Sequence, residues 1–116
     1  MKVIPLSEGA FTIDKTKLFV PFDETKDELQ DRPVGSLLVE IQPIVIITSK
    51  EIILCDTGLG FADADGTMQL LTNLSRAGIN PSQVSKVLLS HLHKDHSGGL
   101  GLPADKSRLA LPNAVY

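Results

Sequence analysis

The residues that most constrain this chain lie in the run Ser90–Gly99, which reads S-H-L-H-K-D-H-S-G-G. This run holds His91, His93, Asp95 and His96, so it contains every histidine of the 116-residue chain and one carboxylate. Imidazole nitrogens and carboxylate oxygens are ligands for divalent metals such as zinc. The H-x-H-x-D-H pattern therefore predicts a metal site, or half of one.

The residues before and after the cluster indicate how it is presented. Val84–Ser90 is apolar and contains β-branched residues, which predicts a buried strand, and the glycines after His96 favour a loop. At a period of two, His91 and His93 would project to the same side and could reach one ion. Asp95 and His96 would follow after a turn and point to a second ion about 3.5–4 Å away, as in many hydrolytic sites.

A surface histidine patch is the alternative interpretation, but the preceding strand and the local glycines favour a metal site. The H-x-x-x-H spacing of a helical zinc site does not occur in this chain. The ligand types do not select one metal, because zinc, manganese, iron and cobalt can all occupy such a set.

Three stretches of the chain resemble the metallo-β-lactamase superfamily. E-I-I-L-C-D-T-G-L-G at Glu51–Gly60 is similar to the family's strand that ends in D-[TS]-G. The helix, turn and strand at Leu70–Ser90 are similar to the segment that leads to its metal loop, and H-L-H-K-D-H-S-G-G is similar to that loop. Together these stretches cover most of residues 35–101.

This resemblance implies a role for each site residue. His91 and His93 would bind a first zinc ion, and Asp95 and His96 would bind a second. Asp95 would also be the catalytic residue that orients or deprotonates the attacking water. Asp56 would brace the metal loop from outside the ligand set, as carboxylates commonly do around metal sites.

The same resemblance implies further ligands that this chain does not supply. The family uses later histidines and a bridging aspartate, whereas no histidine follows His96 and the only later acidic residue is Asp105. We therefore expect residues 1–116 to form the truncated N-terminal half of an αββα sandwich, with the C-terminal half absent. Its fold class would be α/β (α+β), with a mostly antiparallel or mixed sheet and few helices. A missing C-terminal half or a second copy of the chain, in a homodimer, would complete it.

The function implied is that of a hydrolase that uses up to two zinc ions, or iron or manganese, on a small-molecule ester, lactone or thioester. The chain alone would be inactive or nearly so unless a partner supplies ligands. One alternative is a mononuclear iron oxidoreductase of the persulfide dioxygenase kind on the same scaffold. The other alternative is a half-domain that binds metal without catalysis.

Periodicity and turn residues predict the elements around the metal loop. A helix is expected at Met68–Ala77 with Met68, Leu71 and Leu74 on its apolar face, followed by a turn that Asn80 caps. Residues Phe22–Pro33 are charged and predict an exposed loop. The expected strands are Val3–Leu6 and Ala10–Ile13, as a hairpin-like pair, and then Ser36–Ile41, Ile44–Thr48 and Ile52–Cys55. The last three are nearly continuously apolar, which predicts a sheet covered on both faces.

Composition adds weaker constraints. A net charge of −3 argues against a surface that binds nucleic acid. The 42% of hydrophobic residues is enough to form a core. Cys55 is the only cysteine, so it forms no intrachain disulfide, and we interpret it as a buried apolar residue. The sequence shows no signal peptide and no membrane span, so a cytoplasmic location is expected.

Overall fold

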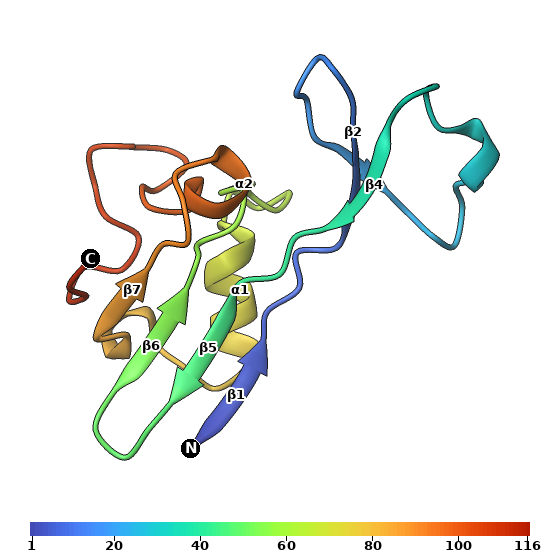
Figure 1. Cartoon of the computed structure of the whole chain (residues 1–116). Coiled ribbons are helices and arrows are strands. Elements are labelled where there is room, and N and C mark those ends of the chain that lie inside the picture. The colour runs from blue at the N-terminus through green and yellow to red at the C-terminus, as the bar shows by residue number, and fades with distance from the viewer.

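The computed structural model describes all residues from Met1 to Tyr116 and contains two β-sheets (Figure 1). The larger sheet has the order β1-β5-β6-β7 and the smaller has the order β3-β2-β4. Neighbouring strands are antiparallel except for the parallel pair β6 and β7. The strands are β1 (Lys2–Pro5), β2 (Ala10–Ile13), β3 (Val20–Phe22), β4 (Leu37–Glu40), β5 (Ile44–Ile47), β6 (Ile52–Cys55) and β7 (Lys86–Leu88). The predicted mixed α/β class with few helices is confirmed.

The helical elements are short. They are α1 (Gln69–Arg76), α2 (Lys94–Ser97) and the 3₁₀ turns η1 (Leu29–Asp31) and η2 (Pro81–Gln83). Asn80 caps η2 as predicted, because its side chain accepts a hydrogen bond from Ser82 N–H and Gln83 returns one to Asn80 N–H. Neither α-helix has the length and apolar character that a bilayer span requires.

Helix α1 covers one face of the larger sheet, and the main core lies between them (Figure 1). The helix was expected at Met68–Ala77, and the observed Gln69–Arg76 lies within that range. The predicted apolar face is wrong in part: Met68 and Leu74 are buried, but Leu70 is the third fully buried side chain, and Leu71 packs at the edge of the core. The difference arises because Met68 precedes the helix, so helical periodicity does not place it.

The opposite face of the larger sheet is bare of helices (Figure 1). Val3 of β1, Ile44 of β5 and Leu88 of β7 are 57%, 38% and 58% exposed, respectively. The expectation that strongly apolar strands are covered on both faces is therefore not met within this chain. Such strands are typical of sheets that pack against a second layer.

The expected hairpin between residues 3–6 and 10–13 is wrong, because β1 and β2 belong to different sheets. The segment at residues 2–13 runs antiparallel to the segment at 37–47, pairing as β1 with β5 in one sheet and β2 with β4 in the other. Between the sheets, Leu6 and Glu8 N–H groups donate to the carbonyls of Pro43 and Ile41, each at 2.7 Å. Alternation of apolar residues revealed the strands but not this change of sheet.

The smaller sheet forms an arm that extends from the body of the molecule (Figure 1). Residues 22–33 lie within the arm: Phe22 ends β3, and residues 23–33 form turns and irregular backbone apart from η1 and are largely exposed, as predicted. A small apolar cluster of Phe11, Ile41 and Leu59 joins the arm to the body.

We expect the core between α1 and the larger sheet to dominate stability. Leu54 of β6 is fully buried in this core, whereas Val34 of the arm is fully exposed. Leu54→Ala should lower the free energy of unfolding by about 2–5 kcal/mol because it leaves a cavity. Val34→Ala, the control, should change it by less than about 0.5 kcal/mol. Urea unfolding followed by circular dichroism measures both, and equal losses would contradict this assignment of the core.

Candidate metal centre

The predicted metal loop follows β7 at the end of the larger sheet (Figure 1). The strand ends at Leu88, so His91 and His93 lie beyond it and strand alternation does not determine their directions. His93 is the residue before α2, and Asp95 and His96 lie within this one-turn helix. The histidines are thus placed by a loop and a helical turn, not by a strand as the sequence suggested.

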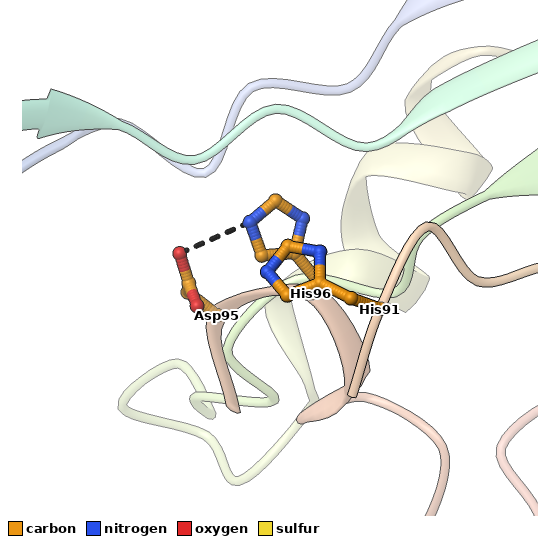
Figure 2. A group of neighbouring side chains, drawn as sticks. All are labelled: His91, Asp95 and His96. Carbon is orange, nitrogen blue, oxygen red and sulfur yellow. Dashed lines mark ion pairs between the residues drawn. The ribbon is translucent and has the colours of Figure 1, made fainter. Parts of the chain in front are cut away.

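Three of the four predicted ligands converge, as Figure 2 shows for His91, Asp95 and His96. One potential ligand atom from each residue lies within 4.8 Å of the others. Asp95 Oδ2 is 3.2 Å from His96 Nε2, and the His91 and His96 ring centroids are 4.1 Å apart. His93 is outside this group, although its ring centroid lies 4.6 Å from that of His91. The division of these ligands between two ions stays a prediction.

Asp56 lies directly behind His96. It follows β6 with a left-handed φ of +63°, and its Oδ2 accepts a hydrogen bond from His96 Nδ1 at 2.8 Å. Its carboxylate also accepts from Ser90 N–H at 2.7 Å and from the Ser90 hydroxyl at 2.8 Å. Burial by itself would raise the pKa of Asp56, but the hydrogen bonds from Ser90 and His96 and the proximity of the His96 ring together lower it. Asp56 is therefore an ionised acceptor that contacts Ser90 and His96 of the metal loop, and its role beside a metal stays a prediction.

These hydrogen bonds orient the two rings toward a common point. Because His96 Nδ1 donates to Asp56, Nε2 is the atom left to bind a metal. The Ser90 hydroxyl donates to Asp56, so its oxygen can accept from His91 Nδ1 at 3.0 Å, and this also leaves Nε2 of His91 free. A carboxylate on the far nitrogen, as at His96, is a usual partner of a metal-binding histidine.

Backbone contacts hold the metal loop against the loop after β6. Thr57 N–H donates to the His96 carbonyl at 2.7 Å, and Gly98 N–H donates to the Gly58 carbonyl at 2.8 Å. Gly99 N–H donates to the Thr57 hydroxyl at 3.1 Å. The approach requires glycine at Gly60, where a Cβ atom would lie 2.1 Å from the Gly98 carbonyl oxygen. The two loops form one unit with almost no space between their main chains.

Two hollows border the site. The larger has a volume of about 640 Å³ and separates the arm from the metal loop. Its lining is mainly apolar and reaches the predicted ligands: Ile13, Lys17, Phe19, Leu37, Val39, Leu92, His93, Lys94 and Asp95. We call this hollow the arm groove. A smaller one of about 310 Å³ lies beside Asp56, Asp95 and His96, under residues 39–43.

Lys94 connects the two walls of the arm groove. Its ammonium donates to the Lys17 carbonyl and lies 5.5 Å from the centroid of the Phe19 ring, a distance typical of a cation–π contact. One residue of the metal loop thus holds the tip of the arm.

Sequence reasoning missed Ser90 and Thr57. Ser90 had a signal, since it stands directly before the first histidine of the motif. Thr57 belongs to the D-T-G stretch, but its hydroxyl contacts with the metal loop depend on the folded positions of both loops.

The model of the metallo-beta-lactamase superfamily matches residues 38–110, so this chain belongs to that superfamily. Solved structures agree. A dizinc quorum-quenching lactonase, AidC, in complex with a product aligns over 97% of this chain with 29% identity and a TM-score of 0.67. A probable metal-dependent hydrolase from Staphylococcus aureus aligns over 98%, with 21% identity and a TM-score of 0.69.

This chain spans 39% of the length of the AidC structure and 45% of the length of the Staphylococcus aureus structure. No curated protein matches it. The AidC structure is described as a dizinc lactonase, which does not favour the iron oxidoreductase alternative.

The close approach of the two loops generates a prediction. Gly60 and Gly66 both have a positive φ, of +77° and +87°, but a Cβ atom at Gly66 would meet nothing within 4 Å. Gly66→Ala should therefore cost only the backbone strain, about 1–2 kcal/mol of unfolding free energy. Gly60→Ala should cost clearly more and should also weaken zinc binding, because it separates the loops. Urea unfolding and zinc titration measure these effects, and indistinguishable variants would contradict the predicted clash.

Proposed function

We propose that this chain supplies the metal-binding loop of a metal-dependent hydrolase, with zinc as the metal. The observation that carries the proposal is the convergence of His91, Asp95 and His96, with Asp56 bonded to the far nitrogen of His96. A histidine patch on an ordinary surface would not need an ionised, partly buried carboxylate behind it.

The residues present fit a zinc ion. Two imidazoles and one carboxylate provide nitrogen and oxygen donors of the kind zinc prefers, and ligand atoms within 4.8 Å of one another can surround one small cation. His91, Asp95 and His96 would hold the ion, and His93 is near enough to His91 to take part or to serve a second ion. A bound divalent ion would supply an activated water and polarise a carbonyl oxygen.

Asp95 is the residue we assign to proton transfer, as the motif predicted. Its carboxylate borders both the arm groove and the smaller hollow, so it can be reached by a substrate from the arm side. A carboxylate in this position can orient an attacking water, take its proton and deliver a proton to the leaving group.

The arm groove supports a substrate with an apolar part. Its volume is in the range of small-molecule sites, about 300–1,000 Å³, and Leu37, Leu92 and Phe19 present apolar surface beside His93. We propose a lactone or a related ester or thioester that carries such a group. The 29% identical structure, a dizinc lactonase in complex with a product, agrees with this choice.

We also propose that a second αβ layer covers the bare face of the larger sheet and adds metal ligands. The exposed Val3, Ile44 and Leu88 side chains on that face are the observation in its favour. A second copy of the chain or further sequence could provide the layer, since a two-fold pair needs only one self-complementary surface.

Removal of ligands tests the metal assignment. Elemental analysis after zinc loading and dialysis should find zinc on the wild-type chain, and the double variant His91→Ala, His96→Ala should bind it more than about 100-fold more weakly. Asp105→Asn, which alters an exposed acid outside the cluster, is the control and should keep wild-type affinity. The zinc-loaded chain is then assayed with lactone, thioester and phosphodiester substrates over a range of chain concentrations.

Zinc that remains on the double variant would contradict the proposed metal site. Hydrolysis of phosphodiesters alone would contradict the lactone or ester assignment. A rate per chain that rises with chain concentration would support a second copy as the covering layer, whereas a constant rate would contradict it.

The arm groove gives a separate prediction about substrate choice. Leu92 lines the groove and is 76% exposed, so burying a substrate chain against it should contribute about 1.5 kcal/mol, or roughly tenfold in kcat/KM. Leu92→Ser should lower kcat/KM for a long-chain acyl ester by this factor and leave an acetyl ester nearly unchanged. Leu109→Ser, at a leucine outside the groove that is 51% exposed, should affect neither. Equal loss on both esters would contradict a role in binding the apolar part.

A further inference from the structure

Glu8 is a buried carboxyl group in the link between β1 and β2. The residue is only 4% exposed. Its Oε1 accepts one hydrogen bond, from Leu59 N–H at 2.9 Å, while its Oε2 is buried with no partner. No lysine, arginine or histidine forms an ion pair with it. Burial raises the pKa of this carboxyl, and the hydrogen bond from Leu59 only partly opposes the change.

Burying such a group costs stability unless its oxygens are satisfied. An apolar side chain at this position would avoid most of that cost. Glu8 therefore needs an explanation beyond core packing, and its contacts provide one.

The carboxyl group lies directly against the loop that follows β6. A Cβ atom at Gly58 would be 2.3 Å from Glu8 Oε1, and Gly58 has a φ of +72°. The Glu8 carboxyl thus fills the space where residue 58 has no side chain and accepts a hydrogen bond from the N–H of the next residue, Leu59. It fixes the position of the Gly58–Leu59 backbone from the arm side.

The other side of the same backbone carries the metal loop. The Gly58 carbonyl accepts from Gly98 N–H, and Thr57 N–H donates to the carbonyl of His96, a predicted ligand. Only the backbone of residues 57–59 therefore separates Glu8 from the predicted metal ligand.

Glu8 is itself held in place by the body of the molecule. Its N–H donates to the Ile41 carbonyl at 2.7 Å, and Gln69 of α1 donates to its carbonyl at 3.3 Å. Asn73 of α1 donates to the neighbouring Ser7 carbonyl at 2.9 Å. The segment that carries the Glu8 carboxyl is therefore anchored both to helix α1 and to the connection between β4 and β5.

We propose that Glu8 is a positioning residue for the metal centre, which acts by holding the backbone of residues 57–59 against the metal loop. It does not touch the ligands themselves. The inference rests on the proposed function for its metal-binding consequence, but the positioning of the backbone is independent of any ion.

Two measurements on the full chain test the proposal. The first is amide hydrogen exchange by NMR without metal, where Glu8→Ala should speed exchange at Thr57, Gly98 and Gly99 but not at the β5 and β6 amides. The second is zinc affinity by competition with a chromophoric chelator, which Glu8→Ala should lower by about 10–100-fold. Glu8→Gln keeps an oxygen acceptor for Leu59 N–H and should restore most of both properties.

Val45→Ala is the matched control for a general loss of stability. Val45 is fully buried in β5, and its truncation should lower the unfolding temperature while zinc affinity stays within about twofold, since it removes packing and not a contact to the metal loop. Wild-type exchange at Gly98 in Glu8→Ala would overturn the positioning role. An equal loss of zinc affinity in Val45→Ala would overturn it as well, because affinity would then follow stability alone.

The two proposals fail separately. If the wild-type chain binds no zinc, the proposed metal function is contradicted, whereas the exchange rates at Thr57 and Gly98 still decide whether Glu8 holds the loop.

Discussion

The contact on which the candidate site depends is the close approach of two stretches of main chain, residues 57–60 and 96–99. Hydrogen bonds from Thr57 and Gly98 join the stretches, and glycines let the backbones meet without side chains between them. The parallel pairing of β6 with β7 places the starts of both loops at the same end of the sheet. The position of His96 is therefore set by a strand pair and a backbone interface, and Asp56 then orients its ring. Packing of α1 on one face of the sheet holds these strands in place.

Much of the fold could be predicted from the sequence, because local patterns determine it. Apolar runs located β4, β5 and β6 to within one residue at each end, and Asn80, Pro81 and the left-handed Gly78 marked the turn after α1. The helix itself was found, although its apolar face was misread because Met68 is buried from outside the helix. The pairing between strands was harder to predict from the sequence. Nothing local shows that residues 2–13 change sheets between β1 and β2, since the partner segment at 37–47 determines that change.

For the candidate site, too, the sequence predicts some features and only the folded chain shows the others. The motif names the chemically active side chains, and the structure brings His91, Asp95 and His96 together. How they are shared between ions is still a prediction, because His93 lies outside that group and strand alternation ends before the loop begins. Glu8 could not be found from sequence at all. A glutamate in a short polar link predicts a solvated charge, and only the folded chain shows it buried against Gly58 and Leu59.

The contact of Lys94 with the Lys17 carbonyl and Phe19 affects how the substrate range of such a site can change in evolution. Lys94 stands between His93 and Asp95, so the tip of the arm is attached to the metal loop itself. A change in the arm that reshapes the groove will also pull on the segment that carries the ligands. Substrate range and metal affinity are then coupled traits. New specificities should accumulate more readily at Leu37 or Leu92, which line the groove without joining its walls.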